Sequence, residues 1–241
     1  QAAMVVGLST RNQLVTFDSA TPQMLMSARF VSGMAANEAL VGIDYRPATG
    51  QLYGLGSFGR LYTLNAMTGA ASLVATLTDS VTGSNILLDG VEFGFDFNPT
   101  VDRIRVTSDR DMNLRINPIT GVTIVDGMLS NAGGGNPHIV GSAYTNNDMD
   151  PSTGTTLYNI DSASDMLTIQ NPANAGTNVN VGPLGMDVSS LVGFDILTSG
   201  NTNTAWAALQ NANGDGSSFF SVNLMTGAAT MVGNIGMAQS S

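Results

Sequence analysis

The stretch Leu61 to Val74 reads LYTLNAMTGAASLV, in which two apolar runs flank a polar segment with Asn and Thr-Gly. Glycine adopts positive φ at little steric cost, so this pattern predicts a strand, a tight turn and a returning strand. Related copies are LVTFDSATPQML from Leu14, NLRINPITGVTIV from Asn113, Leu157 to Gln170, and FFSVNLMTGAATMV from Phe219. The chain therefore reads as a β-repeat protein.

A second motif, a glycine followed by a large apolar residue and an aspartate, precedes most copies. It occurs at Gly42-Ile43-Asp44, Gly94-Phe95-Asp96 and Gly193-Phe194-Asp195, and is degenerate at Gly141-Ser142-Ala143. Successive turn copies begin 44 to 62 residues apart, which brackets the roughly 40 to 50 residues of a four-stranded propeller blade. The sequence predicts an all-β fold, most simply a five-bladed β-propeller. It would form a single domain over residues 1–241, with units near 1–33, 34–80, 81–130, 131–182 and 183–241.

The first unit is one strand short. Met4 to Ser9, Leu14 to Asp18 and Met24 to Val31 supply the second, third and fourth strands, and no stretch precedes them to act as the innermost strand. Closed propellers often complete such a blade with the other end of the chain. We therefore expect the first blade to be incomplete, and to be closed either by Gly233 to Ser241 or by a strand added from a partner.

The composition excludes several functional classes. Charged residues make up 11% of the chain and the net charge is -10, which opposes binding to nucleic acid phosphates. The absence of Cys excludes disulfides and thiol chemistry. No apolar run approaches the roughly 18 residues needed to cross a bilayer, so we expect no transmembrane segment. The start at Gln1-Ala2-Ala3 is the start expected of a processed, exported chain.

Enzyme motifs are weak. Gly54 to Gly59 matches G-x-G-x-x-G, but a strand rather than the required helix is expected to follow it. His138 is the only histidine, and no G-x-S-x-G elbow accompanies it. A metal-assisted propeller hydrolase needs Glu and His ligands, of which the chain has few. We therefore expect a protein that is not an enzyme.

The repeats carry a family resemblance. Gly42-Ile-Asp-Tyr-Arg-Pro with Gly50-Gln-Leu-Tyr-Gly-Leu, Leu61-Tyr-Thr-Leu-Asn, and Gly94-Phe-Asp-Phe-Asn-Pro with Asp102-Arg-Ile-Arg-Val-Thr resemble the bacterial exported family known as domain of unknown function 4394. The resemblance covers most of the chain. It implies export and a propeller-like fold, and it carries no catalytic residues.

Alternating oxygen-bearing side chains mark candidate metal sites in two loops. Asn211, Asn213 and Asp215 precede a glycine as in the opening of a calcium loop, although Val222 stands where a bidentate Glu is required. Asn146, Asp148 and Asp150 form a similar series. We expect these loops to lie on one face of the propeller. Turn-stabilising Asx side chains explain the same residues equally well.

Three aspartates recur on the predicted innermost strands. If Asp44, Asp96 and Asp195 point into the channel, their carboxylates raise one another's pKa and attract a cation or a hydroxyl-rich ligand. The structural alternative is that each carboxylate binds backbone amides of the neighbouring blade.

These observations lead to one leading functional hypothesis and two alternatives. The leading hypothesis is a secreted or cell-surface, non-enzymatic interaction module that self-associates or binds another surface protein or a glycan. It includes the subunit of an extracellular assembly, such as a filament, completed by strand exchange. The alternatives are a propeller that binds calcium or a glycan and the metal-assisted hydrolase, and calcium is the one cofactor under consideration.

Overall fold

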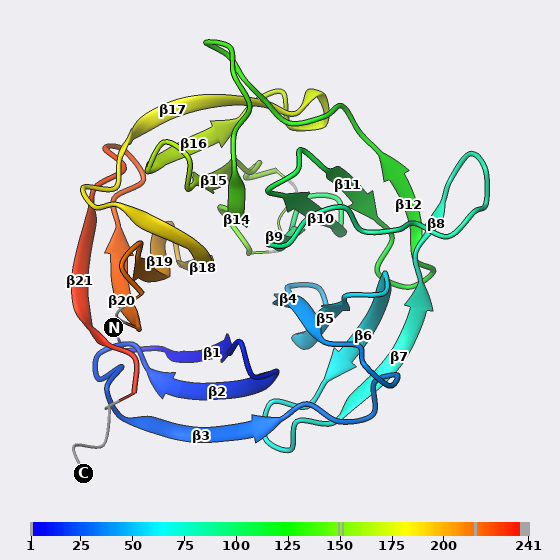
Figure 1. The fold of residues 1–241 in the computed structure, drawn as a ribbon, viewed down its shortest axis with the longest axis horizontal. Helices are drawn as coiled ribbons and strands as arrows, with labels where there is room; N and C mark the ends of the chain where they lie inside the picture. Colours follow the sequence, from blue (N-terminus) through cyan, green and yellow to red (C-terminus); the bar gives the residue numbers. More distant parts are fainter. Residues whose placement is uncertain (1, 149, 151, 215, 237–241) are drawn as a thin grey trace.

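The computed structural model describes residues 2–148, 150, 152–214 and 216–236. Five small sheets, in which the main strands pair antiparallel, stand around a common axis as the blades of a propeller, which confirms the predicted fold (Figure 1). The innermost strands β4, β9, β14 and β18 pack on one another in that order around the axis.

Each blade consists of three or four main strands. The first blade holds β1 (Met4–Leu8), β2 (Gln13–Asp18) and β3 (Leu25–Phe30), and the second holds β4 (Leu40–Arg46), β5 (Gln51–Gly56), β6 (Arg60–Leu64) and β7 (Ala71–Thr76). The third holds β9 (Phe93–Asn98), β10 (Arg103–Ser108), β11 (Asn113–Ile116) and β12 (Val122–Val125). The fourth holds β14 (Ile139–Tyr144), β15 (Leu157–Asp161), β16 (Met166–Gln170) and β17 (Thr177–Pro183), and the fifth holds β18 (Val188–Ser199), β19 (Thr202–Asn211), β20 (Ser217–Val222) and β21 (Ala229–Asn234).

The repeated turn explains why the third and fourth strands pair. In the second blade the Asn65 carboxamide oxygen accepts the backbone N–H groups of Met67 and Thr68, both at 3.0 Å, and Gly69 follows with φ 79°. Asn117 and Asn223 make the same pair of bonds in the third and fifth blades. The Asn closes the turn locally, and Gly provides the left-handed conformation that returns the chain.

The connection between blades repeats as well. In the first three blades, the segment that leaves the outermost strand donates a hydrogen bond to a glycine just before the outermost strand of the next blade. Ser32 N–H donates to Gly69 O at 3.0 Å, Thr78 N–H to Gly121 O at 3.1 Å, and Ser130 N–H to Gly176 O at 2.9 Å. Two of these segments form short parallel strands, β8 (Thr78–Asp79) beside β12 and β13 (Ser130–Asn131) beside β17. We call this repeated bond the latch.

The chain's last described residues use the same latch to close the ring. Gly236 N–H donates to Pro22 O at 3.1 Å, which ties the fifth blade to the residues that precede β3. Beneath the latch, the rings of Phe17 and Phe219 meet edge to face with centroids 5.1 Å apart. Contacts within one chain therefore join the first blade to the last.

The first blade has three strands, as the sequence predicts. The prediction that Gly233 to Ser241 supplies its missing strand is wrong for the part described, because Gly233 and Asn234 instead belong to β21 and pair with β20. Residues 237–241 lie outside the described residues. Strand pairing within the fifth blade explains the difference, since β20 offers the end of the chain an adjacent partner that continues the fifth sheet.

Other sequence expectations concern single motifs. Gly54 to Gly59 connects β5 to β6 as a hairpin, so no helix follows the G-x-G-x-x-G match. Helical structure in the described residues is the short 3-10 turn η1 (Ala173–Ala175). Over the same residues, no helix combines the length and the hydropathy that crossing a membrane requires.

Candidate functional site

The three motif aspartates converge at the axis. Asp44, Asp96 and Asp195 occupy equivalent places on β4, β9 and β18, and a carboxylate oxygen of each lies within 4.8 Å of those of the other two. Ala143 takes this place on β14, so the fourth blade contributes no carboxylate. The gathering of three acids follows from the fold, because equivalent residues of neighbouring blades face a common centre.

Each carboxylate also holds backbone N–H groups on the inner strands. Asp44 accepts one from Tyr45 of its own strand at 2.6 Å and one from Phe97 of the next blade at 2.9 Å. Asp96 accepts the N–H of Tyr144, again of the next blade, at 2.5 Å. The structural alternative offered by the sequence, amide binding in the neighbouring blade, is thus present for Asp44 and Asp96 alongside the cluster.

Burial and mutual repulsion change the protonation of this cluster. Burial, followed by the charge of Asp195, raises the pKa of Asp44 to about 7, although hydrogen bonds from Asp96 and from backbone N–H groups partly offset this. Burial, then the charge of Asp44, raises the pKa of Asp96 well above its usual value. The Asp195 residue is exposed at the axis, but the surrounding protein partly desolvates its carboxylate, and this desolvation raises its pKa too. At neutral pH the cluster therefore carries fewer than three negative charges.

Asp195 differs from the other two in its partners. It accepts the N–H of Ile196 on its own strand at 2.6 Å. The next blade around the ring is the first, which has no innermost strand to offer a further N–H. Among the described residues, Asp195 therefore makes the bond within its strand and lacks the bond between blades.

The first blade presents an unpaired strand edge toward the axis. Ser9 N–H donates to Gln13 O, and Ser19 N–H donates to Ala3 O. Because bonded pairs alternate in an antiparallel ladder, Ala3, Val5, Gly7 and Ser9 direct their backbone groups to β2. The intervening residues Met4, Val6 and Leu8 direct theirs to the other side, where no described strand pairs with β1. We call this place, beside β1 and next to β18, the open position.

The predicted metal loops lie elsewhere, and not on one face. Asn146, Asp148 and Asp150 lie in the β14–β15 connection, between the first and second strands of a blade. Asn211 and Asn213 lie in the β19–β20 connection, between the second and third strands. Antiparallel strands alternate in direction, so these two connections emerge at opposite ends of the blades. The prediction of a common face is therefore wrong.

Side chains in both loops serve local turns. Asp148 accepts the Asp150 N–H at 2.9 Å, Asp150 accepts the Ser152 N–H at 2.9 Å, and Asn211 accepts the Asn213 N–H at 3.0 Å. The Asn146 Oδ1 atom instead accepts a hydrogen bond from Asn203 Nδ2 at 2.7 Å. Asp215, the remaining predicted ligand, lies outside the described residues. The calcium prediction for these loops stays a prediction.

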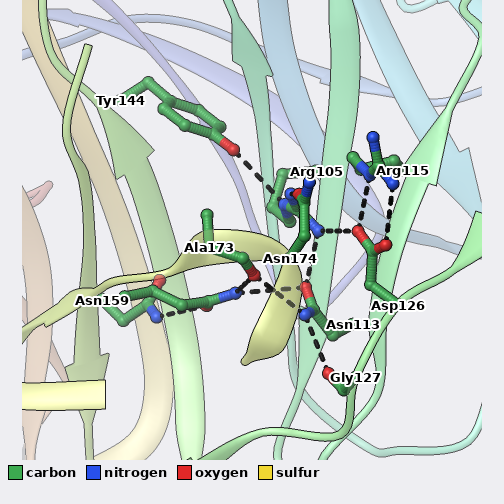
Figure 2. A network of polar contacts seen from close by, with 10 residues as sticks. Arg105, Asn113, Arg115, Asp126, Gly127, Tyr144, Asn159, Ala173 and Asn174 are labelled. Atoms are coloured by element: carbon green, nitrogen blue, oxygen red, sulfur yellow. Dashed lines mark hydrogen bonds and ion pairs between the residues drawn. The ribbon is translucent and has the colours of Figure 1, made fainter. Parts of the chain in front are cut away.

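A buried polar network on the third and fourth blades was not foreseen from the sequence (Figure 2). Arg105 donates from Nη1 to Asn113 and to Asp126, each at 2.7 Å, and from Nη2 to Asn174 at 2.8 Å. Asp126 also accepts from Arg115 at 2.6 and 2.9 Å. Arg105 is buried on β10 opposite Asp96, and its partners come from two blades, so the network fixes their packing. An Arg between the apolar residues Ile104 and Val106 of one strand was the available signal.

Sequence reasoning also missed Gly193 as a functional feature. A Cβ built on Gly42 would lie 2.5 Å from Phe95 Cβ of the next blade, and one on Gly141 would lie 3.0 Å from Phe194 Cβ. At Gly193 the nearest atom is Ala208 Cβ, at 3.6 Å within the same sheet. The available signal was that the fifth unit keeps the Gly-Phe-Asp motif of the third although the blade after it is one strand short.

Solved structures of other proteins have a fold similar to that of this chain. The fold is similar to that of Myxococcus xanthus glutaminyl cyclase, with a TM-score of 0.46 and 12% identity over 78% of this chain and 73% of that one. It is similar to the computationally designed Ika8 protein, with a TM-score of 0.41 and 12% identity over 98% of this chain and 62% of the other. It is also similar to BBS1N solved in complex with ARL6DN, with a TM-score of 0.45 and 14% identity over 97% of this chain and 65% of that one.

Sequence comparison gives the family. No curated protein matches the chain. The model of one family matches residues 13–241, which is nearly the whole length and covers the chain from β2 onward, while β1 lies before the matched residues. The chain therefore belongs to the family described as a domain of unknown function (DUF4394).

Proposed function

We propose that this protein is a secreted or cell-surface, non-enzymatic interaction module that accepts a β-strand from another polypeptide into its first blade. In an extracellular assembly, successive subunits would be joined in this way. The observation that carries the proposal is the unpaired edge of β1. An unpaired edge is a ready template for strand addition, in which main-chain hydrogen bonds supply affinity.

The edge of β1 differs from the inner edges of the other blades. Side chains cover backbone groups of those strands, since Asp44 accepts the N–H groups of Tyr45 and Phe97, and Asp96 accepts that of Tyr144. β1 has no acidic residue to do the same, because it reads Met-Val-Val-Gly-Leu. Its free N–H and C=O groups are therefore available to a strand, and an added strand restores the four-stranded blade seen in the rest of the ring.

A proline at Val6 tests the proposal. Val6 directs its N–H to the open position, so Val6→Pro removes one donor of the free edge while the bonds of Val5 and Gly7 to β2 remain. Proline is tolerated on edge strands for this reason. The matched control is Val6→Ile, which keeps the N–H and the β-branched side chain.

The readouts are light scattering after size-exclusion chromatography, and electron microscopy of the protein secreted by its own cells. We expect assemblies from the wild type and from Val6→Ile, and monomers from Val6→Pro that unfold cooperatively. A wild-type chain that stays a single ring at high concentration and in native material contradicts the assembly. Assemblies that Val6→Pro leaves intact contradict the place of the contact.

A second candidate function is cation binding at the axis, favoured by the convergence of Asp44, Asp96 and Asp195. Carboxylate oxygens are the ligands that calcium prefers, and it takes about six to eight oxygens in a flexible arrangement. Because the pKa values of these groups are raised, a bound cation competes with protons, and its affinity rises with pH.

Thermal unfolding with 1 to 5 mM calcium tests this function, since a ligand that binds the folded state alone raises the melting temperature. We expect a rise in melting temperature that is larger at pH 8 than at pH 6 and is lost in Asp195→Asn. Asp150→Asn is the control that separates the axis from the β14–β15 loop. No change at either pH contradicts a calcium site in both places.

A further inference from the structure

The register of the other blades fixes how a strand would lie in the open position. In the second blade, Gly42 pairs with Leu55, Ile43 with Gly54, and Asp44 with Tyr53. Leu55 in turn pairs with Leu61, the equivalent of Leu14, which pairs with Leu8. An incoming strand, antiparallel to β1, would therefore place its residue equivalent to Gly42 opposite Leu8. The residues that follow would lie opposite Gly7, Val6 and Val5 in turn.

The residue opposite Gly7 would face β18. Its equivalents are Phe95, Ser142 and Phe194, and each of these lies over the motif glycine of the preceding blade. Ser142 lies over Gly94 and shares a hydrogen bond with Thr107, the residue paired with that glycine. Gly193 is paired with the apolar Ala208 instead, as Gly42, which Phe95 covers, is paired with Leu55. Gly193 is the motif glycine of the blade that precedes the open position, and no side chain of the first blade lies over it. The vacancy above Gly193 thus matches a large apolar side chain on the incoming strand.

The residue opposite Val5 would present its N–H to Asp195. Its equivalents are Phe97 and Tyr144, which donate their N–H groups to Asp44 and Asp96 of the preceding blade. Asp195 is the corresponding carboxylate of the fifth blade. It is bonded by Ile196 of its own strand in the same way that Asp44 is bonded by Tyr45, which leaves it free to accept the equivalent bond between blades.

The exposure of β18 agrees with both contacts. Gly193, Asp195 and Leu197 lie on one face of β18, and all three are exposed. On β9, the equivalent residues Gly94 and Asp96 are buried by the fourth blade. An apolar Leu197 that is 40% exposed on this face of β18 marks a surface that a further strand would cover.

We propose that Gly193 and Asp195 select the strand that enters the open position. The selected strand belongs to another polypeptide and reads small residue, large apolar residue, any polar residue, large apolar residue. Its second residue packs on Gly193, and the N–H of its fourth residue binds the Asp195 carboxylate. This inference rests on the proposed function and adds the specificity of the same site.

A synthetic peptide that copies residues 91–98, VEFGFDFN, is a direct probe because it carries this pattern. It is used acetylated, amidated and fluorescently labelled, with binding to the full chain followed by anisotropy. Three changed peptides report on separate contacts. Phe95→Ala removes the side chain over Gly193, N-methylation at Phe97 removes the N–H directed to Asp195, and N-methylation at Asp96 removes an N–H directed to β1.

Variants of the full chain provide the reciprocal test. Asp195→Ala removes the acceptor, and Gly193→Val fills the space above the glycine. Ser190→Ala, at an exposed residue of the same strand, is the control. A hydrogen bond to a charged group contributes enough that its loss weakens binding roughly 10-fold or more. We therefore expect at least this loss for N-methyl-Phe97 and for Asp195→Ala. The two losses should not add when combined, because they remove the same bond.

The outcomes separate this inference from the proposed function. If the peptide binds and N-methyl-Asp96 abolishes binding while N-methyl-Phe97 and Gly193→Val change nothing, β1 accepts strands but β18 does not select them, and the inference is wrong. If no peptide binds and the protein does not assemble, the proposed function fails. If the peptide binds only after deletion of residues 237–241, the chain's own end competes for the open position, which overturns an occupant from another polypeptide.

Discussion

Asp44 and Asp96 show how one residue serves two purposes at the axis. Each carboxylate accepts an N–H from the next blade and also lies against another carboxylate. The hydrogen bonds favour the charged form, whereas burial and the neighbouring charge favour the neutral one, and the second effect dominates because both pKa values are raised. The inner strands are thus held together by groups that resist ionisation.

The pH dependence of stability follows from the raised pKa of Asp44. Its folded pKa of about 7 exceeds the unfolded value of 3.8, so the folded state binds the extra proton between these values. The stabilisation is complete below pH 3.8 and is lost as the pH rises through about 7. Asp44→Asn mimics the neutral carboxyl and should flatten this decline, whose slope is at most about 1.4 kcal/mol per pH unit. Urea unfolding of both proteins from pH 4 to pH 8 measures the difference, and parallel curves contradict the assignment.

Arg105 and Arg115 share Asp126, which makes them a matched pair. Arg105→Met leaves Asn113 and Asn174 without a buried donor and should cost about 3–5 kcal/mol of unfolding free energy. Arg115 is partly exposed and leaves Asp126 still paired with Arg105, so Arg115→Met should cost about 1 kcal/mol or less. Chemical denaturation tests both values, and equal losses would show that burial does not distinguish the two arginines.

At the scale of the element, the motif glycine is a contact between blades. Gly42→Ala puts a methyl group against Phe95 and should cost about 1–3 kcal/mol through overpacking. Gly193→Ala places its methyl group in ordinary van der Waals contact with Ala208 Cβ, at 3.6 Å, and should be neutral, or stabilise by up to about 1 kcal/mol, since it restricts the unfolded chain. The two melting temperatures measure this contrast. A large loss in Gly193→Ala would mean that a segment already covers β18.

The sequence predicted what depends on local pattern. The Asn and Thr-Gly turns identified the hairpin between the third and fourth strands in the second, third and fifth blades, whereas Leu157 to Gln170 forms β15 and β16, the second and third strands of the fourth blade. The spacing identified five blades, and the short first unit predicted a three-stranded blade. The convergence of Asp44, Asp96 and Asp195 followed from their equivalent places. The Arg105 network and the vacancy beside Gly193 were not predicted, because both depend on which residues of neighbouring blades meet. The prediction that the metal loops share a face was wrong for a related reason. The two loops have similar sequences, but they connect different pairs of strands, which the sequence alone does not reveal.

At the scale of the whole molecule, the ring is closed by contacts rather than by a connecting chain. Phe219 stacks on Trp206 of its own blade, with rings 5.1 Å apart, and meets Phe17 of the first blade edge to face. Adjacent blades elsewhere are joined both by packing and by the continuous chain. The boundary between the fifth and first blades is therefore the place where the ring opens most readily.

Removal of this aromatic contact should expose that weakness. Phe219→Ala should cost about 3–5 kcal/mol, as buried aromatic truncations do. Phe97→Ala removes a ring of similar burial that packs on Tyr53 between the second and third blades, and serves as the control. Hydrogen exchange should accelerate in β1 and β21 before the rest of the chain in Phe219→Ala, and evenly in Phe97→Ala. Even acceleration in both contradicts a weak boundary.

The direction of the free edge of β1 decides how a joined assembly would carry mechanical load. A strand seated antiparallel to β1 runs along the edge, so tension applied through it acts parallel to the strand and across the hydrogen bonds. All bonds of the interface then bear the force together and fail together, instead of opening one after another from an end. A short interface of this geometry resists tension along the strand far better than its length implies. A force perpendicular to the strand would instead break its hydrogen bonds one after another.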